Sequence, residues 1–264
     1  METYELYNEA VYKFKVLPFE IDFRKKVNIS ALVGYILNSV SNHAEFCHYG
    51  IEDLKSQNLS WVVLRVSIDM VKYPKMYDYI YVKTWCEGFA KIFTKKNFVF
   101  YDANGGVLGS ARTIWALIDK ETRRPANVSN VLSDRIVNPG IECPASPLSR
   151  IPSLAADVPM KSGFSVSYSD VDFNQHLSSC KYVEHVMDAF SLHKFEKRDV
   201  KRFEIDFIEE CYFSDEIGLY KKEYDNNVFV IELHNQAGSP ICRARITFGG
   251  QDFVENYNPG HKLK

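Results

Sequence analysis

Residues 139–159 read PGIECPASPLSRIPSLAADVP and contain five of the ten prolines of this 264-residue chain. Proline fixes φ and removes a backbone donor, so this stretch is predicted to form neither a central strand nor an uninterrupted helix. We interpret it as a linker that crosses between two halves of the chain. This interpretation predicts an N-terminal unit at residues 1–138 and a C-terminal unit at residues 160–264.

The first half begins with a predicted strand at residues 12–19, followed by a loop and an amphipathic helix at residues 30–46. Apolar side chains recur at helical spacing in this helix, and Ser30 is its predicted N-cap. Asn104-Gly105 is a strong hairpin signal between two of the strands that follow. These strand-like runs are WVVLRVSIDM (61–70), YDYIYVKTW (77–85), KKNFVFYDA (95–103) and ARTIWALID (111–119).

The second half repeats this order, with a predicted strand at residues 164–168 and a helix at residues 179–193. Its later strand-like runs are KRFEIDFIEE (201–210), EIGLYKKEY (216–224), NVFVIELHN (227–235) and CRARITFGG (242–250). A repeat of this length indicates a duplicated domain. One helix cannot cover both faces of a sheet, so each sheet is expected to curl around its helix or to pack on the other unit. Two such units side by side would form one continuous sheet, and the predicted fold class is α+β.

Composition and charge argue against several classes of protein. The 32 lysine and arginine residues balance 34 aspartate and glutamate residues, and no basic stripe typical of a nucleic-acid binder is visible. No apolar run approaches the roughly 18 residues of a membrane span. The N-terminus METYELYNEAVYKFKV lacks a secretion signal, so we expect a cytoplasmic protein. The six cysteines are scattered, which predicts reduced thiols and no metal site, and we expect no cofactor.

The densest polar cluster of the chain is Ser-Asp-Val-Asp-Phe-Asn-Gln-His, at residues 169–176, just before the second predicted helix. Asp172, Asn174 and His176 fall at alternate positions, so they can converge on one side of an extended loop. The N–H groups of the helix that follows can hold an oxyanion. Together these groups suit the hydrolysis of an activated acyl group. The alternative is an ordinary helix-entry loop in which Asp and Asn act as caps.

A second feature is Glu209-Glu210-Cys211, at the end of a strand-like run. Neighbouring carboxylates raise a thiol pKa, so a buried strand cysteine is the alternative to a reactive one. Glu210 and Cys211 can both reach one site only if a bulge or a strand end turns one of them. The first-half loop reads FRKKVNIS and lacks the Asp-x-Asn-x-His pattern, so His43 in the first helix is interpreted as structural.

At these residues the chain resembles the acyl-acyl carrier protein (acyl-ACP) thioesterases, both the plant plastid enzymes and their bacterial relatives. The matching stretches are DVDFNQHLSSCKYVEHV (170–186), Glu210-Cys211, NLSWVVLRVSIDMVKYPKMYD (58–78) and ARTIWALIDKETRRP (111–125). They are ordered along both halves, and the resemblance extends from about residue 10 to 250. The absence of a plant-type transit peptide favours a bacterial cytoplasmic member.

The resemblance implies a tandem hotdog fold, in which two units each wrap a curved antiparallel sheet around a long helix. It implies hydrolysis of fatty acyl-ACP to free fatty acid, which ends chain elongation. The catalytic residues that carry over are Asp172, Asn174, His176, Glu210 and Cys211. Either Cys211 or an activated water is the nucleophile in this scheme. An acyl-coenzyme A thioesterase, a hydroxyacyl dehydratase and a non-catalytic acyl-binding module are the rival functions.

The partner that the resemblance implies is an acyl carrier protein, acylated through its 4'-phosphopantetheine arm. Such a carrier is acidic, and the paired basic residues Lys25-Lys26, Lys95-Lys96 and Arg123-Arg124 are candidates for docking it. The first unit is expected to supply the acyl pocket, with Val33, Ile36 and Trp61 among the side chains that set chain length. The chain already holds two units, and a further homodimer is left open.

Overall fold

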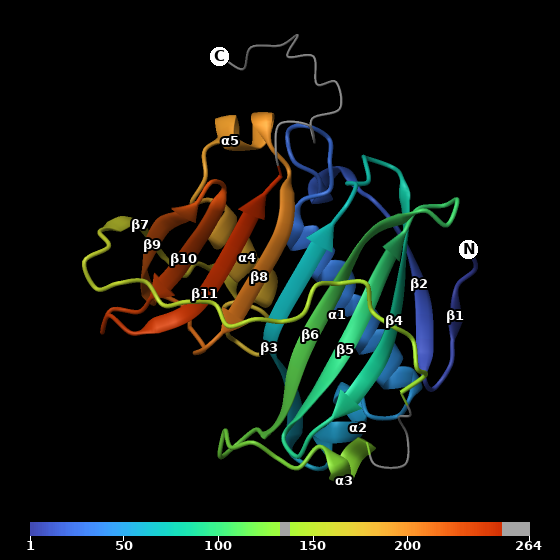
Figure 1. Ribbon diagram of the computed structural model, residues 1–264. Coiled ribbons are helices and arrows are strands. Elements are labelled where there is room, and N and C mark those ends of the chain that lie inside the picture. Colours follow the sequence, from blue (N-terminus) through green and yellow to red (C-terminus); the bar gives the residue numbers. More distant parts are fainter. Residues whose placement is uncertain (133–137, 250–264) are drawn as a thin grey trace.

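A computed structural model describes residues 1–132 and 138–249 of the chain. Within these residues the strands form a single antiparallel sheet with the order β1-β2-β4-β5-β6-β3-β8-β11-β10-β9-β7 (Figure 1). The elements of the first unit are β1 (Tyr4–Glu5), β2 (Glu9–Lys15), η1 (Pro18–Glu20), α1 (Ile29–Phe46), α2 (Ile51–Lys55), β3 (Leu59–Met70), β4 (Tyr79–Phe89), β5 (Phe93–Tyr101), β6 (Val107–Asp119) and α3 (Ser129–Leu132). Those of the second unit are β7 (Met160–Ser165), η2 (Tyr168–Asp170), α4 (Ser179–Met187), α5 (Leu192–Lys197), β8 (Val200–Phe207), β9 (Glu216–Asp225), β10 (Val228–His234) and β11 (Pro240–Phe248).

The two units join where β3 pairs with β8. The pairing is antiparallel, and its register sets Arg65 opposite Asp206 and Ile68 opposite Phe203. An ion pair between Arg65 and Asp206 reinforces this seam. The prediction of one continuous sheet is therefore confirmed.

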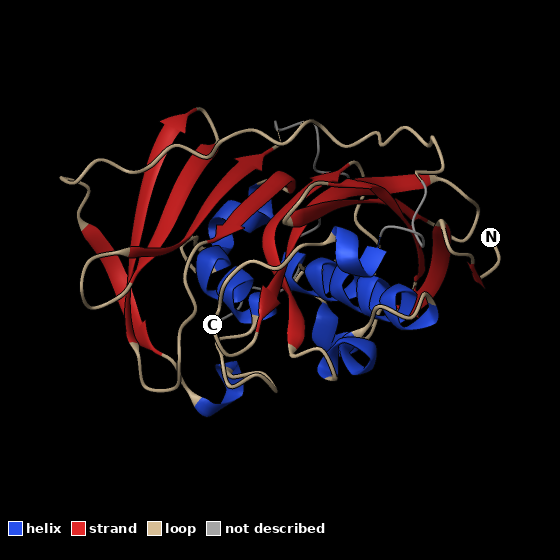
Figure 2. Ribbon diagram, turned by 90° about the horizontal axis from the view of Figure 1, so that it is seen from below, coloured by secondary structure: helices blue, strands red, loops and turns tan. Residues whose placement is uncertain are grey.

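The long helices α1 and α4 lie on the same face of the curved sheet, which bends around them (Figure 2). Their apolar sides and the inward-facing strand residues form one core cluster, with Leu32, Ile36, Val183 and Phe203 fully buried. The helices also touch each other, because the Ser30 hydroxyl donates to the Cys180 carbonyl at 3.1 Å. This architecture is the α+β tandem hotdog that the resemblance implies.

The proline-rich segment, residues 138–159, forms no helix or strand and crosses the sheet on the face away from α1 and α4 (Figure 1). Side chains on that face hold it at intervals. Arg65 Nη1 donates to the Ser149 carbonyl at 3.2 Å, and the Leu154 N–H donates to Glu232 Oε1 at 3.2 Å. The segment thus runs from the first unit to the edge strand β7 of the second.

Several element boundaries differ from the sequence-based expectation. The N-cap of α1 is Asn28, whose side chain accepts from the Ala31 N–H at 2.7 Å, and not Ser30. Strand β2 stops at Lys15, before Pro18 begins a 3-10 turn. The predicted helix at 179–193 is split into α4 and α5, because Ser191 is extended and starts a new helix.

Residues 250–264 of the predicted C-terminal unit lie outside the described residues. None of the described helices combines the length and the apolar character needed to cross a bilayer.

Candidate active site

The polar cluster folds into a tight loop, residues 171–177, that the Asp172 side chain organises. Its Oδ1 accepts the N–H groups of Asn174 at 2.8 Å and of His176 at 3.4 Å. The backbone closes the turn, since the Asp172 N–H donates to the His176 carbonyl at 2.9 Å. Gln175 has a positive φ of 66°, a conformation few non-glycine residues adopt. The aspartate therefore builds the loop that presents Asn174 and His176.

The first unit contains the same loop at residues 21–27. Asp22 Oδ1 accepts the N–H groups of Arg24 at 2.8 Å and of Lys26 at 3.3 Å. These two cations stand where the second unit has Asn174 and His176, and both bind the buried Asp199 of the second unit, at 2.6 and 2.7 Å. One copy of the loop is therefore a structural ion-pair cluster between the units, and the other carries amide and imidazole groups.

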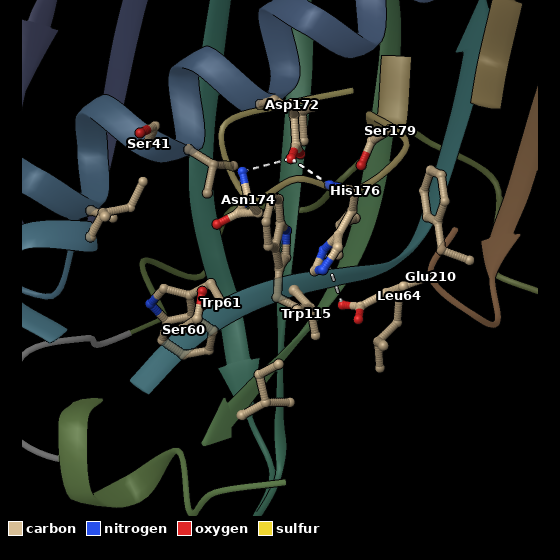
Figure 3. A pocket seen from close by; sticks show the side chains of 18 of the residues that line it. Ser41, Ser60, Trp61, Leu64, Trp115, Asp172, Asn174, His176, Ser179 and Glu210 are labelled. Atoms are coloured by element: carbon tan, nitrogen blue, oxygen red, sulfur yellow. Dashed lines mark hydrogen bonds and ion pairs between the residues drawn. The ribbon is translucent and has the colours of Figure 1, made fainter. Parts of the chain in front are cut away.

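His176 meets Glu210 beside the seam between the units. The segment after β8 pairs with the loop through a bridge between His176 and Tyr212, and this brings Glu210 Oε1 to 3.6 Å from His176 Nδ1 (Figure 3). The Tyr212 ring packs edge-on against the imidazole, with ring centroids 5.1 Å apart. The Nδ1 side of His176 thus faces a carboxylate, and its other nitrogen remains for a substrate or a water.

The start of helix α4 differs from the start of α1. Asn28 caps α1 with its side chain, whereas the equivalent Ser178 makes no such hydrogen bond to the first turn of α4. Ser179, the first residue of α4, lines the same cavity as His176 (Figure 3). Uncapped N–H groups at a helix N-terminus attract negative charge. The second unit therefore keeps a positive helix end next to the imidazole.

Cys211 is the one predicted site residue that the structure does not bring to the cavity. Its side chain is 1% exposed and belongs to the core cluster, and burial raises the pKa of its thiol. Its carbonyl binds the loop, accepting from the Leu177 N–H at 2.8 Å. Strand β8 ends at Phe207, and in the segment that follows it Glu210 lines the cavity while Cys211 packs in the core.

A cavity of about 570 Å³ opens beside these groups and runs into the first unit. This is in the size range of small-molecule binding pockets. Trp61 and Trp115 lie in it below Asn174 and His176 (Figure 3). Helix α1 contributes the apolar wall through Leu37, Val40 and Ala44. The cavity is therefore shared, with polar groups from the second unit at one end and apolar side chains from the first unit along it.

The inner end of the cavity is not wholly apolar. Lys96, on β5, is 3% exposed and donates to the Tyr49 hydroxyl at 2.9 Å. Strand β6 lies between β5 and the seam strand β3. Neighbouring strands are about 5 Å apart, so β5, which carries Lys96, lies roughly 10 Å from β3. Nearby His43 is buried, which lowers its pKa to about 4, and it contacts the Leu6 carbonyl at 2.7 Å.

Several sequence-based expectations about the surface and the pocket need correction. Val33 and Ile36 pack in the core and are not among the side chains that line the cavity. Of the basic pairs considered for docking, Lys26 is bound to Asp199 and Lys96 is buried.

Arg123, from the turn after β6, forms an ion pair with Glu210 and lines the cavity. Sequence reasoning missed this contact, and it also missed Tyr212 beside His176. No local signal marks either contact, because the Arg123 contact depends on how the two units meet and the Tyr212 contact depends on the bridge between this residue and His176.

The comparisons with known proteins agree with this architecture. The model of the acyl-ACP thioesterase N-terminal domain matches residues 8–136, and that of the C-terminal domain matches residues 155–250. The solved structure of an acyl-ACP thioesterase from Bacteroides thetaiotaomicron superposes with a TM-score of 0.86 at 31% identity, covering 91% of this chain and 98% of that one. The 12:0-ACP thioesterase from Umbellularia californica, at 19% identity and a TM-score of 0.81, shares the fold.

Curated plant relatives are more distant and longer. Oleoyl-acyl carrier protein thioesterase 2 of Arabidopsis thaliana is 24% identical over 88% of this chain and 68% of its own length. The oleoyl-acyl carrier protein thioesterase of Coriandrum sativum is 24% identical over 84% of this chain and 64% of its own. The chain thus spans about two thirds of the plant relatives. Both domain models and the solved relative at 31% identity show that this chain belongs to the acyl-ACP thioesterase family.

Proposed function

We propose that this protein hydrolyses fatty acyl-ACP thioesters to free fatty acid and carrier thiol. The observation that supports this most directly is the shared cavity, with an imidazole and a carboxylate at one end and an apolar wall along it. Such a cavity fits an acyl chain whose thioester carbonyl lies beside His176. Family membership supports the carrier-bound form of the substrate.

His176 is the proposed general base. Glu210 faces Nδ1 at 3.6 Å, which favours the tautomer with a proton on Nδ1 and a free lone pair on Nε2. That distance is longer than a hydrogen bond, and catalytic contacts of this kind commonly tighten when substrate binds. Nε2 would take a proton from a water as the water oxygen bonds to the carbonyl carbon. Such base catalysis contributes about 10²–10⁴-fold.

The uncapped start of α4 is the proposed oxyanion site. As water adds, the carbonyl oxygen gains a negative charge, and the first-turn N–H groups beginning at Ser179 can donate to it. The tetrahedral intermediate then collapses with cleavage of the C–S bond. The proton held on His176 passes to the departing sulfur, and the products are a carboxylic acid and the free thiol of the carrier arm.

Asp172 and Asn174 have different proposed roles. Asp172 already accepts two backbone N–H groups, so its main role is to hold the loop that aims His176. The side-chain amide of Asn174 lies in the cavity, where it can bind the attacking water or the carbonyl. Cys211 is proposed to support packing only, because its buried thiol has a raised pKa and lies outside the cavity.

Enlarging the apolar part of the cavity should shift chain-length preference. Trp61 lines the cavity, so Trp61→Ala is expected to raise turnover of longer acyl chains relative to shorter ones by about 10-fold. Turnover measured across a series of saturated acyl-ACP substrates tests this. Val33→Ala, at a core position of α1 outside the cavity lining, is the control and should leave the profile unchanged. An unaltered profile in Trp61→Ala would argue against this wall as the acyl site.

The carrier should be recognised partly by charge. The acidic carrier meets a protein of net charge −2, so docking needs a local basic patch. Lys25, in the loop at residues 21–27, and Arg124, next to Arg123, keep exposed side chains, while Lys95 lies 3.8 Å from Glu87. Free cysteine thiols are consistent with action in a reducing cytoplasm.

The function is tested by thiol release from acyl-ACP and acyl-coenzyme A of equal chain length, at low and moderate salt. We expect faster release from acyl-ACP, and a steeper loss with salt for that substrate. Equal rates and equal salt dependence would instead favour an acyl-coenzyme A thioesterase. Loss of a 3-hydroxyacyl substrate without thiol release would indicate a dehydratase, and binding without turnover would indicate an acyl-binding module.

A further inference from the structure

We propose that Arg123 of the first unit is a positioning residue for the active site of the second unit. Its guanidinium forms an ion pair with Glu210 Oε1, the same oxygen that lies 3.6 Å from His176 Nδ1. The proposal rests on the proposed function of His176 and Glu210. Under this proposal neither unit holds a complete site, because Arg123, which fixes the Glu210 carboxylate, comes from the first unit.

The turn that carries Arg123 is built to hold it. Asp119 Oδ1 accepts the N–H of Thr122 at 2.7 Å and its hydroxyl at 2.9 Å. The Arg123 N–H donates to the Asp119 carbonyl at 3.0 Å. Arg123 itself has a φ of 56°, a left-handed conformation that few non-glycine residues adopt. The side-chain and backbone bonds of Asp119 stabilise this conformation, which directs the arginine across the seam.

The charge arrangement explains what the arginine does. A paired guanidinium favours the ionised form of a carboxylate and holds it in place. Glu210 is then an acceptor oriented toward His176 Nδ1, while the positive charge of Arg123 limits how strongly the carboxylate stabilises an imidazolium. The other charged groups that line this cavity are Lys96, Lys120, Asp172 and Glu209.

Docking of the carrier is the competing role for Arg123, because its side chain is 42% exposed. The two roles differ in which substrates they affect. A docking arginine matters only for a thioester bound to the carrier, and its loss raises KM. A positioning arginine matters for every thioester, and its loss lowers kcat.

The test compares Arg123→Ala, Arg123→Lys and the matched control Arg124→Ala on acyl-ACP and on a short thioester of N-acetylcysteamine. Arg123→Ala should lower kcat at least about 10-fold on both substrates. Arg123→Lys should restore part of this loss, and Arg124→Ala should leave turnover of the short thioester unchanged. In a Glu210→Gln background, removal of Arg123 should have little further effect, because the two residues act as one unit.

A readout independent of turnover separates this proposal from the proposed function. The imidazole of His176 is titrated by NMR in the wild type and in Arg123→Ala. We expect the midpoint to move to higher pH in the variant, because Glu210 then stabilises the imidazolium without a competing cation. An unchanged midpoint together with unchanged kcat on the short thioester would overturn the role of Arg123. Full activity of a folded His176→Ala variant would instead overturn the proposed site itself.

Discussion

Replacement of His176 by alanine should lower turnover of acyl-ACP at least about 100-fold, because the proposed general base is lost. The fold should survive, since the loop is held by the Asp172 side chain and by backbone bonds that do not involve the imidazole. Steady-state kinetics, with circular dichroism as the check on folding, measures both effects. Asn174→Ala should also lower turnover by about 100-fold, because the proposed role of its amide is to bind the reacting carbonyl or water.

Cys211→Ala is the control for this prediction. The thiol is buried in the core and outside the cavity, so the variant should keep turnover close to the wild type while losing some stability. Cys211→Ser should likewise remain active. Loss of activity in both folded cysteine variants, with His176→Ala retaining activity, would contradict the proposed assignment of roles.

Replacement of Asp199 by alanine should destabilise the protein by about 3 kcal/mol, because it leaves the half-buried Lys26 without its carboxylate and leaves Arg24 with Asp22 as its only remaining ion-pair partner among the described residues. Asp199 is 3% exposed and binds both Arg24 and Lys26 across the two units. The free energy of unfolding from urea titration measures the loss. Asp157→Ala, at an exposed aspartate of the proline-rich segment, is the matched control and should be nearly neutral. A loss below about 1 kcal/mol for Asp199→Ala would show that this cluster does not stabilise the fold.

Much of the fold could be predicted from the sequence because its signals are local. Helical spacing predicted α1, and alternating apolar runs with the Asn104-Gly105 turn predicted the strands of the first unit. The predicted end of the second long helix, at residue 193, was wrong by several residues, because α4 ends at Met187. Apolar residues continue past Met187, and the break depends on Ser191 adopting an extended conformation that starts α5.

The site divides in the same way into local and non-local parts. Asp172, Asn174 and His176 share one loop, so their spacing was enough to bring them together. Glu210 was proposed from the resemblance, and its contact with His176 depends on the bridge to Tyr212.

The contact between Arg123 and Glu210 depends on the pairing of β3 with β8, and no single stretch of the sequence indicates that pairing. The matching loop at Asp22 was missed because Arg24 and Lys26 replace the amide and the imidazole. Its signal was the shared Asp-Phe pair at residues 22–23 and 172–173.

The central claim, that water activated by His176 hydrolyses the thioester directly, is tested most directly by a single-turnover reaction. Excess enzyme is mixed with acyl-ACP and quenched over time, and mass spectrometry follows the enzyme while free fatty acid and carrier thiol are quantified. The account predicts that acid and thiol appear with one rate constant and that the enzyme mass never changes. An acyl group that accumulates on Cys211 and decays at the rate of fatty acid release would contradict it.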